Sequence, residues 1–140
     1  MGMRKVFKLL HLALIGGAFY LWIEILWRGH THWTMGVVGG LCFIGIGMIN
    51  HIFPYEMPLY VQAIIGMLLV TVIELVAGLI INIWLGLSVW DYSQLPFNIL
   101  GQICVPYMLL WLPLSMMAII LYRLLRYWLF NEAKPHFKLF

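Results

Sequence analysis

The sequence predicts an all-α integral membrane bundle of four transmembrane helices. Three observations support this prediction: 64% of the residues are hydrophobic, only 9% are charged, and the apolar residues fall into four long runs. A soluble domain of this length leaves about a third of its unfolded-chain surface exposed after folding. The eight basic and five acidic residues cannot cover that surface, so a bilayer must take up the remainder.

The first two runs match the length of single membrane crossings. They cover about residues 7–27 and 35–53, each close to the ~20 residues that a helix needs to cross the hydrocarbon. The polar connection between them is short, and Trp27 and Trp33 serve as its interfacial anchors. A proline-containing turn over residues 54–58 then breaks the helix.

The last two runs are longer and less regular. The third, over about residues 59–86, exceeds a straight crossing, so it must tilt or protrude. The fourth, over about residues 98–128, contains Pro106 and Pro113, where kinks are expected. The segment between these runs mixes apolar and polar residues, which is compatible with a re-entrant or interfacial turn in which Asp91 caps a short helix.

Basic residues indicate the membrane topology. They gather toward the two ends of the chain, as Arg4, Lys5 and Lys8 at one and Arg123, Arg126, Lys134 and Lys138 at the other. By the positive-inside rule both termini face the cytoplasm, and four crossings agree with that arrangement. We expect a single membrane domain over residues 1–140 of a multi-pass protein of the cell membrane, with a cytoplasmic tail from residue 129 onward.

Polar side chains recur inside the apolar runs at helical spacing. Glu24 and Arg28 lie four residues apart, close enough to pair, while Glu74 and Asn82 share one face of the third run. A carboxylate at membrane depth costs several kcal/mol unless it is paired, hydrogen-bonded or protonated. We expect one polar cluster toward the outer half of the bundle, whose candidate binding residues are Glu24, Arg28, Glu74, Asn82, Asp91, Asn98 and Gln102.

This cluster has two interpretations. Three carboxylates against one guanidinium leave a surplus of two negative charges, which favours a proton- or cation-linked binding site. The alternative is a structural network of ion pairs and amides that fixes the helix register.

Other chemistries find little support in the sequence. His30 and His32 could share a metal ion, but no third ligand is nearby, so capping or interfacial roles are favoured and we expect neither a metal nor a cofactor. The basic residues show no aromatic interleaving, which argues against nucleic-acid binding. No nucleophile or nucleotide motif is present, and an enzyme is not expected, although paired carboxylates leave an intramembrane lipid-modifying enzyme open.

Gly36 and Gly40 form a small-residue seam on the second run. Such a seam lets a neighbouring helix approach closely. Four helices rarely enclose a pathway alone, so we expect a homo-oligomer that associates through this seam within the lipid bilayer.

Three stretches of the chain resemble the ABC-transporter permease family called CmpB-like or type IV. They are WIEILWRGHTHW at 22–33, WLGLSVWDYS at 84–93 and PFNILGQIC at 96–104, and the resemblance covers about residues 16–122. It implies a multipass membrane protein with permease-like activity, and all seven candidate binding residues fall within the part of the chain that the resemblance covers. An ATPase partner is doubtful, because the inner connection over residues 54–58 is only a turn and offers no coupling segment.

The sequence therefore supports two functions of different classes. The first is a small transporter or permease-like subunit, in which Glu24 and Glu74 bind protons or a small solute, a cation among the candidates, while Arg28 and Asp91 organise an outer gate. The second is a non-transporting membrane scaffold or regulatory subunit whose polar cluster only holds the fold.

Overall fold

The computed structural model describes residues 2–53 and 57–132, without the side chains of Asn50 and His51. Its helices are α1 (Met3–Arg28), α2 (Trp33–Gly47), the single turn α3 (Ile49–Ile52), α4 (Leu59–Gly78) with its π-helical extension η1 (Leu79–Trp84), and α5 (Val105–Phe130). Two short strands, β1 (Asn98–Ile99) and β2 (Ile103–Cys104), pair antiparallel just before α5. Most of the proline turn and most of the tail lie outside the described residues.

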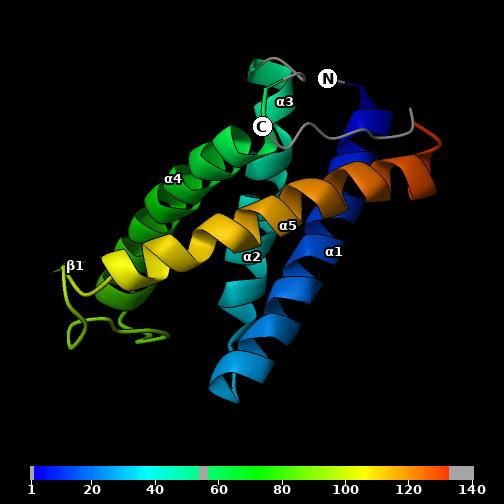
Figure 1. Ribbon diagram of the computed structural model, residues 1–140. Helices are drawn as coiled ribbons and strands as arrows, with labels where there is room; N and C mark the ends of the chain where they lie inside the picture. Colours follow the sequence, from blue (N-terminus) through cyan, green and yellow to red (C-terminus); the bar gives the residue numbers. More distant parts are fainter. Residues whose placement is uncertain (1, 54–56, 133–140) are drawn as a thin grey trace.

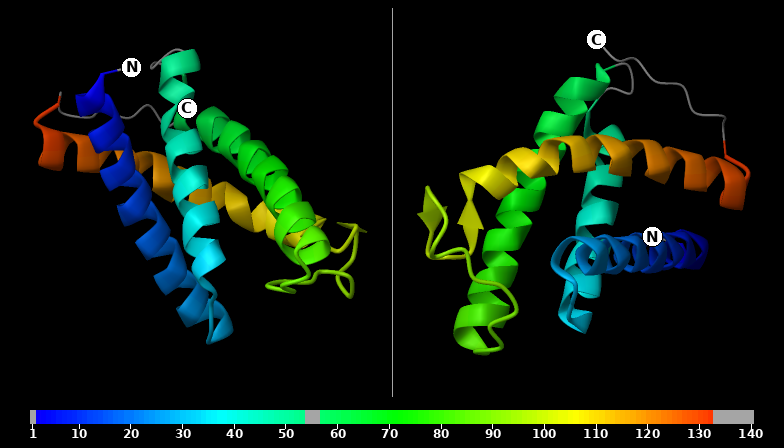
Figure 2. Two further views of the ribbon diagram at one scale, coloured as in Figure 1. Left: turned by 180° about the vertical axis from the view of Figure 1, so that it is seen from behind. Right: turned by 60° about the horizontal axis from the view of Figure 1, so that its bottom comes forward.

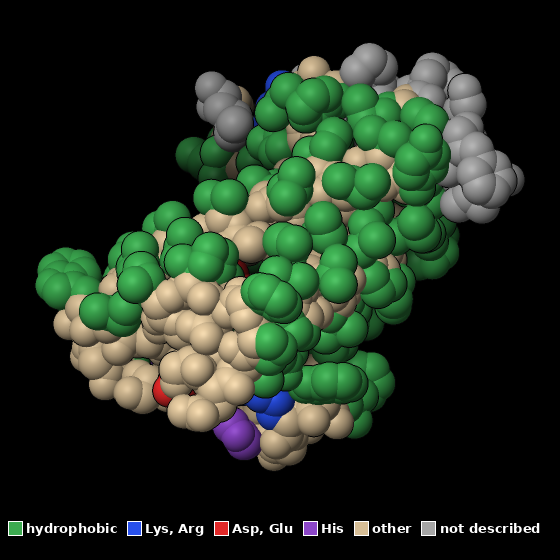
Figure 3. All heavy atoms as spheres, turned by 60° about the vertical axis from the view of Figure 1, so that its left-hand side comes forward, with side chains coloured by type: hydrophobic (Ala, Val, Ile, Leu, Met, Phe, Trp, Pro, Cys, Tyr) green, Lys and Arg blue, Asp and Glu red, His purple; other side chains and the backbone are tan. Residues whose placement is uncertain are grey.

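The prediction of a four-helix membrane bundle is confirmed. Three helical spans of 26 residues each are long and apolar enough to cross a membrane: Met3–Arg28, Leu59–Trp84 and Val105–Phe130. The fourth helix, α2, is apolar but has only 15 residues, and α3 extends it after a single intervening residue. In an 18-residue apolar stretch of each span, only between 22% and 33% of the residues are buried, so most of each stretch is at least partly exposed, as lipid contact requires. Figure 3 shows hydrophobic side chains over much of one such face, with Lys, Arg and His side chains at its edge.

The helices α1, α2 and α4 form a layer, and α5 crosses this layer diagonally. In Figures 1 and 2, α1, α2 and α4 lie side by side, and α5 runs across one face of all three. The larger core cluster joins α5 to α2, α3 and α4 through buried residues that include Ile46, Val70, Trp111 and Ile119. A smaller cluster of Leu12, Phe43 and Tyr122 joins α5 to α1 and α2. The crossing helix therefore holds the layer together.

The two ends of the described chain meet on one side of the bundle. Lys8 Nζ in α1 lies 3.6 Å from Glu132 Oε2 just after α5, and the Lys8 ammonium sits 5.4 Å from the centre of the Phe130 ring. Arg126 also pairs with Glu132, with Nη2 2.6 Å from Oε1. The start of α1 and the end of α5 are thus neighbours.

Close backbone contact between α1 and α2 depends on glycine. A Cβ atom on Gly17 would collide with the Gly36 carbonyl oxygen, and a Cβ on Gly40 would lie 2.7 Å from the Ala13 carbonyl oxygen. The prediction that the seam of Gly36 and Gly40 mediates oligomerisation is therefore wrong, because α1 of the same chain already occupies it.

The segment before α5 differs from the sequence prediction. The fourth helix begins at Val105 rather than near residue 98, because Leu100 (φ 55°) and Gly101 (φ 71°) form a left-handed turn that pairs β1 with β2. Pro106 stands in the first turn of α5, where a proline needs no helical N–H partner, whereas Pro113 is inside the helix. The residues from 87 to 97 contain no helix, so the expectation that Asp91 caps one is also wrong.

The glycine contacts allow a matched test of the α1–α2 packing. We expect Gly40→Ala to lower the melting temperature in detergent, with overpacking costing about 1–3 kcal/mol, because the added methyl group meets backbone that cannot move aside. Gly36→Ala is the control, because its methyl group would meet only the Leu21 side chain, at 3.1 Å. Equal melting temperatures for the two variants would contradict the proposed role of Gly40.

Candidate functional site

Glu74 is the most deeply buried carboxylate at the centre of the bundle. It lies on α4, its residue is 4% exposed, and both of its carboxylate oxygens accept hydrogen bonds from neutral donors. Tyr92 Oη donates to Oε2 at 3.0 Å, and Trp111 Nε1 on α5 donates to Oε1 at 3.3 Å. No Lys or Arg among residues 2–53 and 57–132 forms an ion pair with Glu74. The site therefore holds this carboxylate without a compensating positive charge.

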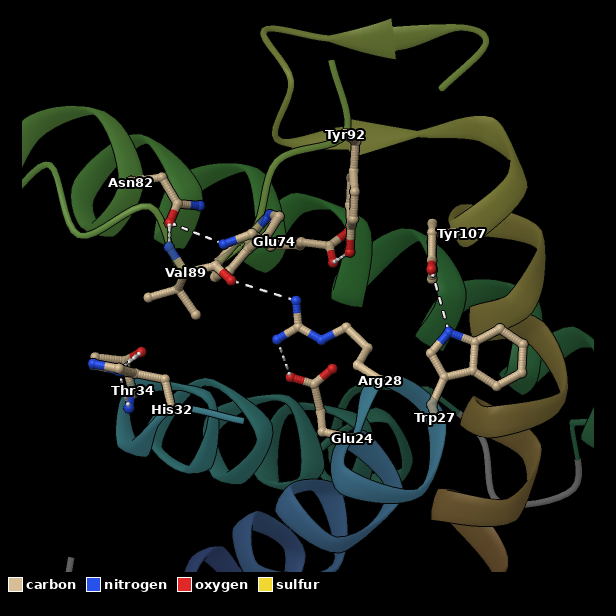
Figure 4. A network of polar contacts seen from close by, with 11 residues as sticks. Glu24, Trp27, Arg28, His32, Thr34, Glu74, Asn82, Val89, Tyr92 and Tyr107 are labelled. Carbon is tan, nitrogen blue, oxygen red and sulfur yellow. Dashed lines mark hydrogen bonds and ion pairs between the residues drawn. The ribbon is translucent and has the colours of Figure 1, made fainter. Parts of the chain in front are cut away.

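The prediction that Glu24 and Arg28 can pair on α1 is confirmed. Arg28 Nη2 donates to Glu24 Oε1 at 2.9 Å, and Nη1 donates to the Val89 carbonyl oxygen at 3.4 Å. Glu24 is 7% exposed and lies one helical turn before Arg28, which terminates α1 next to the left-handed Gly29. The guanidinium therefore connects the end of α1 to the loop that follows η1, as Figure 4 shows.

Asn82 and Gln102 hold that loop against the helices. Asn82 Oδ1 accepts the Val89 N–H at 2.7 Å, and Asn82 Nδ2 donates to Gln102 Oε1 at 2.8 Å. The Gln102 carbonyl oxygen in turn accepts the Trp90 indole N–H at 3.1 Å. Asn82 lies in the π-helical segment η1, a geometry that often occurs at functional sites. A continuous chain of contacts thus runs from Glu24 through Arg28, Val89 and Asn82 to Gln102.

Asp91 and Asn98 do not join this network. Asp91 is exposed, and its Oδ1 accepts the Ser93 N–H at 2.9 Å, which lowers the pKa of its carboxyl group. Asn98 donates to the carbonyl oxygens of Ser93 and Leu95 and accepts the Gly101 N–H. Both side chains stabilise local turns. Without Asp91, the cluster has two carboxylates against one guanidinium, a surplus of one negative charge rather than two.

Sequence reasoning missed the two donors that hold Glu74. Tyr92 and Trp111 lie 18 and 37 residues away along the chain, so no helical spacing links them to the carboxylate. Burial raises the pKa of the Tyr92 phenol, and the Glu74 carboxylate raises it further, so Tyr92 keeps its proton and acts as a donor. Its ring stacks on Tyr107 with centroids 4.7 Å apart, and Trp27 Nε1 donates to Tyr107 Oη at 3.2 Å. Aromatic residues are common at membrane interfaces, which hides such a role in the sequence.

A second buried polar pair was also missed. Arg123 is only 7% exposed and donates from Nη2 to Gln62 Oε1 at 2.7 Å, while Gln62 Nε2 donates to the Met57 carbonyl oxygen. Arg123 therefore lies inside α5 and packs against α4.

His32, between α1 and α2, has a structural role. His32 caps α2, where its Nδ1 accepts the Thr34 N–H at 3.3 Å and lies 2.8 Å from Thr34 Oγ1. Within the described residues, no group of three His, Cys, Asp or Glu side chains is arranged to hold a metal ion.

The role of Asn82 can be tested by amide hydrogen exchange. We expect Asn82→Leu to raise the exchange rate at Val89 and to cost about 1–3 kcal/mol of stability, because the Val89 N–H loses its acceptor. Asn98→Ala is the comparison, since it should affect the Gly101 amide and leave Val89 protected. Unchanged protection at Val89 in Asn82→Leu would contradict the assigned contact.

Comparison with known proteins agrees with these features. The model of a family described as "Putative ABC-transporter type IV" matches residues 14–139, which is most of the chain. No curated protein and no solved structure matches. With its apolar membrane-spanning helices and this match, the chain is a transporter-like membrane protein that belongs to the CmpB-type ABC-transporter family.

Proposed function

We propose that this protein is a small transporter or permease-like subunit whose intramembrane polar site binds protons or a small cationic solute at Glu74. The observation that carries the proposal is the state of this one side chain. Glu74 lies within a membrane-spanning helix, is 4% exposed, and contacts neutral donors but no cation within the described part of the chain.

The charge of the site supports a cationic partner. Arg28 neutralises Glu24, so the Glu24–Arg28 pair leaves Glu74 as the uncompensated group. An ionised carboxylate in a low-dielectric interior is strongly disfavoured, and either a proton or a bound cation removes that cost. The two neutral donors stabilise the carboxylate only in part, so the site favours the binding of a positively charged group.

The Glu24–Arg28 pair has a positioning role in this proposal. Its guanidinium reaches the Val89 carbonyl oxygen, three residues before the tyrosine that donates to Glu74. A change in the ionisation or occupancy of Glu74 can therefore reach the loop through Tyr92, and the loop is tied to α1 through Arg28. We assign the control of access to this loop through its contacts with Arg28 and Glu74, and not to the side chain of Asp91.

We also propose that both termini face the cytoplasm and that the protein functions in the cell membrane as a homo-oligomer. The contact between Lys8 and Glu132 supports placing the two ends on one side, and the basic residues near them favour the cytoplasmic side. Another surface than the glycine seam must then mediate assembly, since α1 covers Gly40.

The second candidate function is a non-transporting scaffold or regulatory subunit. The network of Asn82, Gln102 and Trp90 favours it, because these groups satisfy one another and need no ligand. On that account, Glu24→Gln and Glu74→Gln change stability alone and no ion crosses the membrane.

Flux in proteoliposomes tests the transport proposal. The purified protein is reconstituted with an internal pH-sensitive dye, and uptake of protons or of radiolabelled methylammonium is driven by a membrane potential. We expect faster uptake in wild-type vesicles than in protein-free vesicles. In Glu74→Gln this excess uptake should fall at least about tenfold, because the amide carries no charge to attract a cation.

Glu132→Gln is the matched control for this assay. It makes the same chemical change in a carboxylate at the end of the bundle, away from the site, and should keep the wild-type flux. Equal flux in Glu74→Gln and wild type would remove the carboxylate from the mechanism. No excess flux in the wild-type protein would favour the scaffold.

A further inference from the structure

An apolar cavity lies beside Glu74, between helices that converge at only one end. Its volume is about 310 Å³, and α1, α2, α4 and α5 all contribute to its walls. In Figures 1 and 2, α1 and α5 cross near the Lys8 end and diverge toward the other end. Phe19 on α1 and Met117 on α5, which line the cavity, are 44% and 61% exposed, and both helices are long and apolar enough to cross a membrane. The cavity therefore opens sideways toward the bilayer.

The walls of this cavity combine apolar surface, aromatic rings and a single acidic group. Tyr20, Trp90 and Trp111 contribute aromatic side chains, and the Tyr20 and Trp111 ring centroids lie 6.0 Å apart. Glu74 is the only lining residue whose side chain carries a formal charge among the described residues. Trp111 both lines the cavity and donates to Glu74, so aromatic surface and carboxylate are adjacent.

This combination selects a particular ligand chemistry. A neutral apolar ligand fills the cavity but supplies no counter-charge, so the Glu74 carboxyl group must then stay protonated. A small hydrated cation supplies the charge but must give up its water to walls that offer few polar groups. An apolar body with a positive head satisfies both, and aromatic faces attract such a head by about 0.5–2 kcal/mol each. The volume is at the lower end of ligand pockets, which run from about 300 Å³ upward, and therefore suits one small aromatic cation.

We propose that this cavity binds lipophilic monovalent cations that enter from the bilayer, with the apolar body between α1 and α5 and the cationic head at Glu74. This inference rests on the cation-binding role of Glu74 in the proposed function and specifies the class of its substrate. It does not require that binding leads to transport.

Binding of benzyltrimethylammonium to the detergent-purified protein tests the proposal. We expect saturable binding by calorimetry, with tryptophan fluorescence as a second signal because Trp90 and Trp111 line the cavity. Tetramethylammonium, which has the same head without the ring, should bind at least about fivefold more weakly. Glu74→Gln should weaken benzyltrimethylammonium binding at least about tenfold, since it removes the counter-charge.

A cavity-filling variant separates the cavity from the carboxylate. Ala118 lines the cavity two helical turns after Trp111, so Ala118→Phe should weaken benzyltrimethylammonium binding about tenfold. Leu109→Phe, at a position on α5 that is 56% exposed and outside the cavity lining, is the control and should bind as wild type does. Melting temperatures verify folding, and Ala118→Leu replaces the larger substitution if Ala118→Phe does not fold.

The outcomes distinguish this inference from the proposed function. Binding that is lost in both Glu74→Gln and Ala118→Phe supports the inference, whether or not wild-type vesicles show flux. Absence of saturable binding, or unchanged binding in Ala118→Phe, overturns it. Glu74-dependent proton flux without benzyltrimethylammonium binding overturns the inference and leaves the proposed function standing.

Discussion

One constraint organises this molecule: a carboxylate on the membrane-spanning helix α4 is buried with no ion-pair partner in the described part of the chain. Burial of such a group is costly, and the structure meets part of that cost with hydrogen bonds from Tyr92 and Trp111. Those two donors come from the loop before β1 and from α5, so both segments must be held against α4. Much of the fold outside the helical layer serves this purpose.

The loop that carries Tyr92 is held in place by contacts on both of its sides. On one side, close packing at Gly17 and Gly40 sets α1 directly against α2 and places the Glu24–Arg28 pair at the end of α1, where it reaches the loop. On the other side, the side chain of Asn82 binds Val89 and Gln102 and so secures the same loop to η1 and to the turn between β1 and β2. The loop is therefore fixed from two directions, and Tyr92 is positioned as a consequence.

The sequence predicts the features that depend on local spacing. Long apolar runs predict the helices, and the four-residue interval between Glu24 and Arg28 predicts their ion pair. Features that depend on contacts distant in sequence could not be predicted in this way. Trp111 reaches Glu74 because α5 crosses α4, and Tyr92 reaches it from the loop before β1. The helix α5 starts late because Leu100 and Gly101 form a left-handed turn inside an otherwise apolar run. Spacing also cannot show which helix occupies a glycine seam, or that the exposed Asp91 turns toward its own loop.

The most direct test of the central claim is the reactivity of the carboxyl groups toward an apolar carbodiimide that partitions into the bilayer. Such a reagent adds covalently to acidic side chains that it can reach from lipid, and peptide mass spectrometry locates the adduct. Glu74 borders the apolar cavity and has no ion-pair partner in the described chain, whereas Glu24 is bound to Arg28 and is not part of the cavity wall. The account predicts modification at Glu74 with Glu24 unmodified, and modification of Glu24 in preference to Glu74 would contradict it.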